Sequence, residues 1–174
     1  DVIVCDHHTP GDELPDAVAV LNMKRSDCPY PYKDLSGCGV GFKLAQAYTQ
    51  RYGLPFENLV PLLQLLAMSI ASDIVPITGE NRILAHFGIQ QLNKAPFTGL
   101  SAIMSVAGIE AKKLTINDLV YKIGPRINAC GRMKSGRAAV ELLLTDDPEF
   151  ARQQAEEVNH HNEDRRDCDT ETTK

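Results

Sequence analysis

The first 22 residues, Asp1–Asn22, have the sequence DVIVCDHHTPGDELPDAVAVLN and contain two short runs that favour β-strands. Val2–Cys5 is continuously apolar and rich in β-branched residues, which is typical of a parallel strand covered on both faces. Ala17–Leu21 is a second such run, and the proline and glycine residues between the two runs predict turns. These runs predict an α/β fold that starts with short parallel strands.

Polar side chains follow the first apolar run without any transition. Asp6, His7 and His8 come directly after Cys5, at the carboxyl end of the strand, where parallel sheets bind their ligands. Imidazole and carboxylate groups are ligands of divalent transition metals such as Mn, Fe and Zn. Adjacent strand residues point to opposite sides, so we expect one histidine to bind an ion and its neighbour to bind a substrate phosphate. An exposed turn that carries two histidines is the alternative.

The rest of the chain shows mostly helical spacing of its apolar residues. Leu59–Ile70 is apolar nearly all round, which predicts a central buried helix. Asp73 follows this helix, at the end where the helix dipole is negative, so a cation nearby would remove an unfavourable interaction. Termination of the helix into solvent is the alternative. Further helices are expected over Asn81–Leu92, Leu100–Val106 and Asn117–Lys122.

A cationic segment lies within this chain, whose formal net charge is −5. No acidic residue occurs between Asp118 and Glu141, while the same interval contains Lys122, Arg126, Arg132, Lys134 and Arg137. The stretch IGPRINACGRMKSG, residues 123–136, also contains glycine and proline, so we expect irregular backbone there. Exposed N–H groups and guanidinium groups in such a loop can bind phosphate. A solvated basic loop is the alternative.

Several other classes of protein are not favoured. No apolar run approaches the roughly 20 residues that span a bilayer, and no signal-peptide pattern is present, so we expect a cytoplasmic location and no membrane partner. The five cysteines form no C-x-x-C pair, which argues against a disulfide framework or a thiolate zinc site. The stretch SGCGVGF, residues 36–42, is an incomplete dinucleotide fingerprint, and close packing of a helix start explains its glycines more simply.

A last helix is expected to begin at Asp147-Pro148, with an acidic N-cap and proline at the first helical position. Apolar residues become sparse from there to Lys174, which is typical of a connector rather than a core helix. The chain also enters directly into an apolar strand at Val2, so we expect it to be an internal fragment.

Four stretches in series resemble the DHH phosphoesterase family. They are the triplet Asp6-His7-His8, LSGCGVGFKLAQAY (residues 35–48), ASDIVPITGENR (residues 71–82), and IGPRINACGRM (residues 123–133) followed by AVELLLTDD (residues 139–147). Within the family, these stretches are most similar to exonucleases that degrade single-stranded DNA from its 5′ end in DNA repair and recombination. The resemblance covers nearly the whole chain in the expected order.

The resemblance implies a role for several residues. His7 and Asp73 would ligate Mn²⁺ or Mg²⁺, one of two ions that together activate water for in-line attack on the phosphodiester. His8 would contact the scissile phosphate, and Asp6 would orient the two histidines. The residues that hold DNA phosphates would be Arg132, Asn128 and Arg126.

The resemblance also implies an organisation. Residues 1–145 would form the second, C-terminal half of a DHH-type catalytic domain, with short parallel strands followed by a mostly helical region, and residues 146–174 would start a long connector helix. Only half of the metal shell would then be present, so we expect the fragment alone to be inactive. We also expect self-association through the exposed edge of Val2–Cys5. The alternatives are a phosphodiesterase of oligonucleotides or cyclic dinucleotides, and a module that binds nucleic acid without cleaving it.

Overall fold

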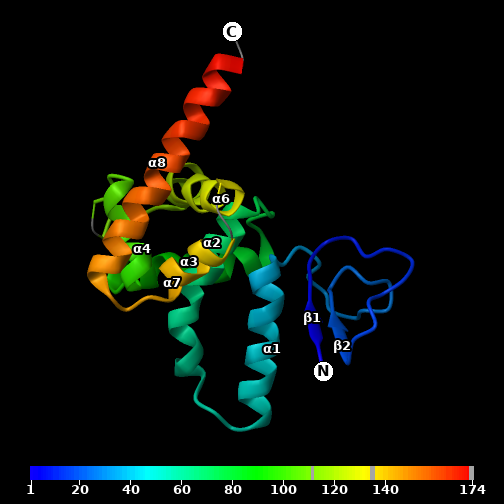
Figure 1. Cartoon of the computed structure of the whole chain (residues 1–174). Helices are drawn as coiled ribbons and strands as arrows, with labels where there is room; N and C mark the ends of the chain where they lie inside the picture. Colours follow the sequence, from blue (N-terminus) through cyan, green and yellow to red (C-terminus); the bar gives the residue numbers. More distant parts are fainter. Residues whose placement is uncertain (111, 134–135, 173–174) are drawn as a thin grey trace. The chain divides into compact units, whose positions relative to one another are not determined.

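The computed structural model describes the backbone of residues 1–110, 112–133 and 136–172, and the side chains of residues 130–133 and 165–172 lie outside this description (Figure 1). The chain divides into two compact units, Asp1–Gly88 and Ile89–Lys174. Two short parallel strands are followed by a mostly helical region. The predicted α/β fold with short parallel strands is therefore confirmed.

The first unit begins with the two predicted strands. β1 (Ile3–Cys5) pairs in parallel with β2 (Ala19–Leu21), and Cys5 lies opposite Leu21 (Figure 1). The expectation that the first strand is covered on both faces is wrong, because Val2 is 61% and Ile3 52% exposed. The reason is that α1 (Gly37–Arg51) packs against β1, and the described part of the chain places no second layer over Val2 and Ile3.

A local sequence signal marks the start of α1 but not that of α2 (Leu63–Ser72), whose N-cap residue Leu62 makes no side-chain capping hydrogen bond. Ser36 caps α1, and its hydroxyl oxygen accepts a hydrogen bond from the Gly39 N–H at 3.2 Å. The predicted helix over Leu59–Ile70 is wrong at its start, because the chain forms a 3₁₀ helix, η1 (Phe56–Leu62), before α2 begins. Pro61 lies within η1 and has no N–H to donate.

The next helix, α2 (Leu63–Ser72), is buried as predicted, with Leu66, Ala67 and Ile70 at most 1% exposed. It packs in a core cluster with Phe42 of α1. The following helix, α3 (Gly79–Lys94), confirms the helix predicted over Asn81–Leu92. The boundary between the two units falls within α3. The position of Asp73, at the end of α2, is therefore fixed by a buried helix.

The regular elements that the structure describes in the second unit are all helices. Its elements are α4 (Thr98–Val106), α5 (Ile116–Asp118), the π-helical turn η2 (Leu119–Ile123), α6 (Gly124–Met133), α7 (Gly136–Leu144) and α8 (Pro148–Thr172). α8 packs against α4 and α6. No described helix in either unit is long and apolar enough to cross a membrane.

The irregular backbone predicted for residues 123–136 is wrong, because residues 124–133 form α6. The Gly124 N–H donates to the Leu119 carbonyl across η2, so the usual helical hydrogen-bond pattern is interrupted next to Pro125, which has no N–H. The helix therefore accommodates a proline that we expected to break it.

The start of α8 is confirmed. The Asp147 carboxylate oxygen Oδ1 accepts hydrogen bonds from the N–H groups of Glu149 at 2.9 Å and Phe150 at 3.2 Å. Ala151, Ala155 and Val158 are buried, so the first half of α8 belongs to the core of the second unit, contrary to the expectation of a helix outside the core. The division at residues 145 and 146 stays a prediction about domain organisation.

A capping box begins α5. The Asp118 carboxylate accepts hydrogen bonds from the N–H and the hydroxyl of Thr115 at 2.9 and 2.7 Å, and pairs with Lys122 at 2.7 Å. The Lys122 ammonium, together with Thr115, lowers the pKa of Asp118 from 3.8 to about 2.

The low pKa of Asp118 predicts how stability changes with pH. A carboxylate whose pKa is lower in the folded state stabilises the fold above its unfolded pKa of 3.8, and this contribution is lost as the pH falls toward about 2. We expect Asp118→Asn to lower the free energy of unfolding by about 1 kcal/mol at pH 6, and by less at pH 3. Urea unfolding of both proteins at the two pH values checks this, and a constant difference would contradict it.

Candidate metal centre

The Asp6 carboxylate fixes the turn that follows β1. The Asp6 N–H donates to the Leu21 carbonyl at 3.0 Å and so continues the pairing of the two strands. The Asp6 oxygen Oδ1 accepts from the N–H groups of His7 at 2.8 Å and His8 at 3.3 Å, and lies 2.8 Å from His8 Nδ1. The hydrogen bond to the His8 side chain is the main cause that holds the pKa of Asp6 below its usual value. Asp6 therefore fixes the backbone of both histidines and the ring of His8.

Asn22 holds the same turn from β2, and the sequence reasoning missed it. Its amide nitrogen Nδ2 donates to the His8 carbonyl oxygen at 2.8 Å, and its oxygen Oδ1 accepts from the Lys24 N–H at 2.9 Å. Asn22 follows the second strand as Asp6 follows the first, and Cys5 lies opposite Leu21. The rule that ligands bind at the carboxyl ends of parallel strands could have identified it.

His7 and Asp73 come together from the end of β1 and the end of α2. His7 Nε2 lies 3.8 Å from Asp73 Oδ2, and their side chains are 18% and 39% exposed. The Asp73 N–H donates to the Ser69 carbonyl at 2.9 Å, and the Ser69 hydroxyl donates to Asp73 Oδ2 at 3.4 Å. Ser69, which the sequence reasoning also missed, thus contacts the carboxylate oxygen that faces His7.

This pair can share one divalent cation. Metal–ligand bonds to nitrogen and oxygen are about 2.0–2.2 Å long, so two donors 3.8 Å apart are close enough to contact the same ion. Imidazole nitrogen and carboxylate oxygen form a mixed donor set that suits first-row divalent ions. Among the residues that the structure describes, no three His, Cys, Asp or Glu side chains gather in a possible metal site. The pair therefore supplies two donors, and a complete shell needs others.

The beginning of α1 lies against this pair. A Cβ atom added to Gly37 would lie 3.4 Å from His7 Cδ2, an ordinary van der Waals contact, so the first residue of α1 lies beside the imidazole. Burial raises the pKa of the neighbouring Cys38 thiol, and the negative charge of Asp73 raises it further. The predicted packing role of the glycines is wrong for Gly41, which has no atom within 4 Å of an added Cβ.

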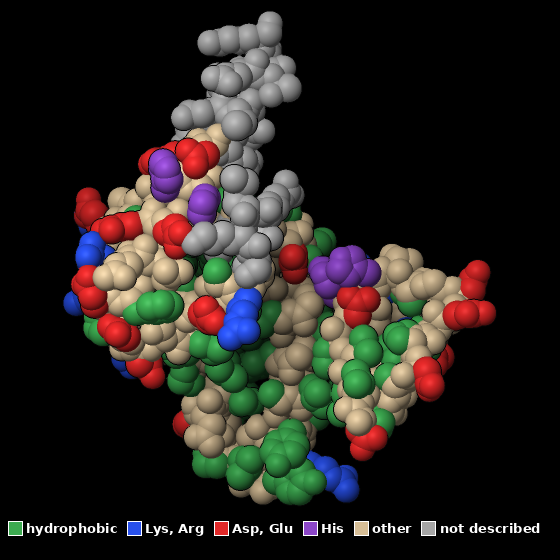
Figure 2. Space-filling view, in the orientation of Figure 1, with side chains coloured by type: hydrophobic (Ala, Val, Ile, Leu, Met, Phe, Trp, Pro, Cys, Tyr) green, Lys and Arg blue, Asp and Glu red, His purple; other side chains and the backbone are tan. Residues whose placement is uncertain are grey.

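The surface of the first unit shows the same grouping. Histidine side chains gather beside an acidic group above the strands in Figure 2. His8 is the more exposed of the two histidines, with 79% of its side chain accessible. The His8 ring is therefore accessible from solvent.

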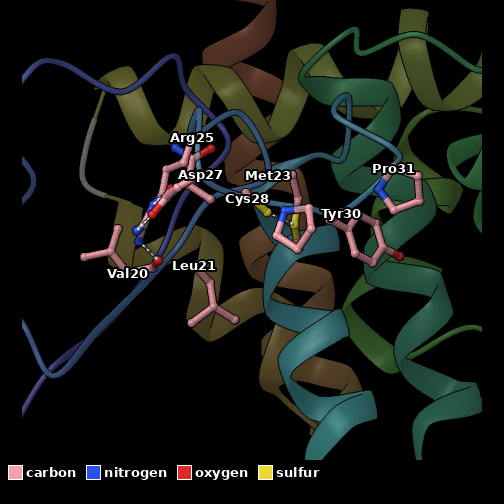
Figure 3. A pocket seen from close by; sticks show the side chains of 10 residues that line it. Val20, Leu21, Met23, Arg25, Asp27, Cys28, Tyr30 and Pro31 are labelled. Carbon is pink, nitrogen blue, oxygen red and sulfur yellow. Dashed lines mark hydrogen bonds and ion pairs between the residues drawn. The ribbon is translucent and has the colours of Figure 1, made fainter.

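A separate pocket of about 530 Å³ opens beside β2 and is mostly lined by apolar side chains (Figure 3). Its one arginine, Arg25, donates from Nε and Nη2 to Asp27 at 2.9 and 2.6 Å, and from Nη1 to the Val20 carbonyl at 2.7 Å (Figure 3). The acidic partner neutralises this guanidinium, so the pocket is a poor fit for phosphate.

The predicted DNA-binding residues all belong to α6, in the second unit. Arg126 Nε donates to Asn159 Oδ1 at 2.8 Å and Nη1 donates to the Lys122 carbonyl at 2.6 Å, so its guanidinium ties α6 to α8. Asn128 is exposed. The side chain of Arg132 lies outside the described residues, but a spacing of four places Asn128 and Arg132 on one face of the helix.

Comparison with known proteins gives consistent matches. Residues 1–70 match the DHH family, N-terminal domain. The chain is 38% identical to the single-stranded-DNA-specific exonuclease RecJ of Bacillus subtilis (strain 168), over 95% of this chain and 20% of that protein. It is 37% identical to the protein of the same name from Escherichia coli (strain K12), over 97% of this chain and 31% of that protein.

Solved structures with a similar fold carry the same name. A crystal structure of RecJ in complex with Mn²⁺ from Thermus thermophilus matches with a TM-score of 0.82 and 32% identity, over 95% of this chain and 24% of that chain. A crystal structure of exonuclease RecJ bound to manganese matches with a TM-score of 0.83 and 32% identity, over 95% and 41% of the two chains. The chain spans 20% and 31% of the lengths of the two curated relatives above.

Proposed function

Because residues 1–70 match the DHH family and the chain is homologous to one segment of the RecJ proteins, we propose that it forms part of a metal-dependent exonuclease. Its substrate would be single-stranded DNA, hydrolysed from the 5′ end in cytoplasmic DNA repair and recombination. The chain spans less than a third of these curated relatives, so the activity is proposed for the intact protein.

The approach of His7 to Asp73 carries this proposal. Their side chains come from the ends of a strand and a helix, and their nitrogen and oxygen atoms lie 3.8 Å apart. We assign both residues as ligands of Mn²⁺ or Mg²⁺. When bound, such an ion supplies positive charge to the phosphodiester and lowers the pKa of water.

The neighbouring residues of the triplet would act on the substrate. Asp6 Oδ1 lies 2.8 Å from His8 Nδ1, which leaves the other ring nitrogen of this exposed histidine for a phosphate oxygen. Gly37, the first residue of α1, lies against His7, and the N-terminus of a helix attracts anions. His8 would therefore contact the scissile phosphate, and Asp6 would be its positioning residue.

The second unit and the edge of β1 would contribute to DNA binding, domain organisation and self-association. Asn128 and Arg132 would contact DNA phosphates from one face of α6, and Arg126 would contribute less because its guanidinium already binds Asn159. Residues 1–145 would belong to the catalytic domain, and residues 146–174 would begin a connector helix. The exposed apolar residues of β1 would favour self-association of the chain.

Paramagnetic NMR tests the metal assignment directly. Mn²⁺ should broaden the imidazole signals of His7 and of His8, whose ring centroid lies 4.4 Å from that of His7, and Asp73→Asn should weaken Mn²⁺ binding by at least about 10-fold. His160 is the internal control, because it lies on α8 and its Nε2 lies 3.8 Å from Asp164 Oδ2, one helical turn away. Broadening of His160 as strong as that of His7 would contradict the assignment. Asp146→Asn is the matched control for Asp73→Asn, because it removes an exposed carboxylate that is not part of the proposed metal centre.

A further inference from the structure

The connection between α2 and α3 contains a residue in an unfavourable conformation. Ile74, which follows the proposed ligand Asp73, has φ at +52° and is 80% exposed. β-Branched residues rarely adopt the left-handed region, because Cβ crowds the backbone. Because the Ile74 side chain is exposed, its packing offsets little of this strain. The segments on either side of Ile74 must therefore impose the conformation.

A buried amide anchors this connection. Asn81, at the beginning of α3, is 0% exposed. Its nitrogen Nδ2 donates to the Pro76 carbonyl at 3.0 Å and to the Asp34 carbonyl at 2.6 Å. One side chain thus ties the middle of the connection to the segment that precedes α1. Removal of a buried donor that serves two carbonyl groups leaves both of them without that partner.

Tyr32 anchors the same connection from outside. Its hydroxyl lies 2.9 Å from the Thr78 carbonyl and 3.2 Å from the Pro76 carbonyl, and donates to them. Its ring packs against Gly79, where an added Cβ would lie 2.7 Å from Cε2 and where φ is +46°. Both anchors therefore hold residues 76–79 in place, only three residues after Asp73.

We infer that Asn81 is a positioning residue of the proposed metal centre, with Tyr32 as its support; this inference rests on the proposed function. The anchored connection stops α2 at Asp73 and turns the chain sharply at Ile74. Without the anchor, Ile74 is free to relax to a negative φ, and the last turn of α2 is free to fray. The Asp73 carboxylate would then lose its fixed position 3.8 Å from His7.

The test compares two asparagines that make the same kind of contact. Asn93, in the second unit, joins Leu114 through two hydrogen bonds of 2.9 Å, from Nδ2 to the carbonyl and from the Leu114 N–H to Oδ1. We expect Asn81→Ala to weaken Mn²⁺ binding, measured by electron paramagnetic resonance, by about 10-fold. Asn93→Ala should weaken it by less than about 2-fold, although it removes a comparable anchor.

A second variant separates positioning from general loss of structure. Glycine adopts positive φ without cost, so Ile74→Gly should restore most of the Mn²⁺ affinity lost in Asn81→Ala. Tyr32→Phe removes only the hydroxyl and should weaken binding by about 2- to 3-fold; it provides the test if Asn81→Ala does not fold.

The outcomes distinguish this inference from the proposed function. Equal Mn²⁺ affinities of Asn81→Ala and Asn93→Ala, or no recovery with Ile74→Gly, would overturn the positioning role while His7-dependent binding by the unaltered protein persists. If the unaltered protein shows no His7-dependent Mn²⁺ binding, the proposed function fails and the positioning role fails with it.

Discussion

Replacing His7 with alanine should lower the proposed manganese-dependent hydrolysis of single-stranded DNA by the intact protein by about 10²–10³-fold. The substitution removes Nε2, one of the two donors that approach each other at 3.8 Å. The fold should persist, because His7 is not part of the apolar core. The value of kcat/KM measures the loss, and circular dichroism confirms that the variant is folded. His160→Ala is the control, since this exposed histidine lies on α8.

Asp73→Ala should cause a loss of similar size, and the double variant makes the experiment sharper. Substitutions of two groups that act on the same ion have strongly non-additive effects on the rate. The double variant, His7→Ala with Asp73→Ala, should therefore lower kcat/KM little more than the more damaging single substitution does. If the two losses multiply instead, the side chains act independently and do not share a cation. An unchanged rate in either single variant would contradict its assignment as a ligand.

The sequence predicted the parts of this site that follow apolar runs. Asp6, His7 and Asp73 could be singled out because these polar groups follow apolar runs that predict a strand and a helix. Asn22 and Asn81 were not predicted, since a single asparagine after a strand or in the first turn of a helix is common in turns and caps. Their importance lies in which distant carbonyl groups they reach, and periodicity within one segment does not contain that information.

The basic stretch shows where local rules failed. Three glycines and a proline over residues 123–136 predicted irregular backbone, but α6 occupies residues 124–133. Packing against α8 and the π-helical turn before Pro125 compensate for poor helix propensity, and tertiary contacts commonly have this effect. The correction changes the arrangement proposed for DNA contacts, because Asn128 and Arg132 now share a helix face rather than a loop.

Glycines also illustrate why sequence alone is insufficient. Gly41 of α1 and Gly88 of α3 both lie in helices, where alanine is intrinsically preferred by about 1 kcal/mol. An added Cβ on Gly41 meets no atom within 4 Å, whereas on Gly88 it would overlap the Leu63 carbonyl oxygen and lie 2.7 Å from Ala67 Cβ. The same substitution should therefore have opposite effects at the two positions.

We expect Gly88→Ala to lower the free energy of unfolding by about 3 kcal/mol, because α3 must move away from the backbone of α2. Gly41→Ala, the matched control, should raise it by about 0.5–1 kcal/mol. Urea unfolding measures both changes, and a neutral Gly88→Ala would contradict the close approach of the two helices. α2 also ends at Asp73, so a shift of this helix moves the proposed ligand. Folded Gly88→Ala should consequently bind Mn²⁺ more weakly than Gly41→Ala, which links the packing of α2 to the metal centre.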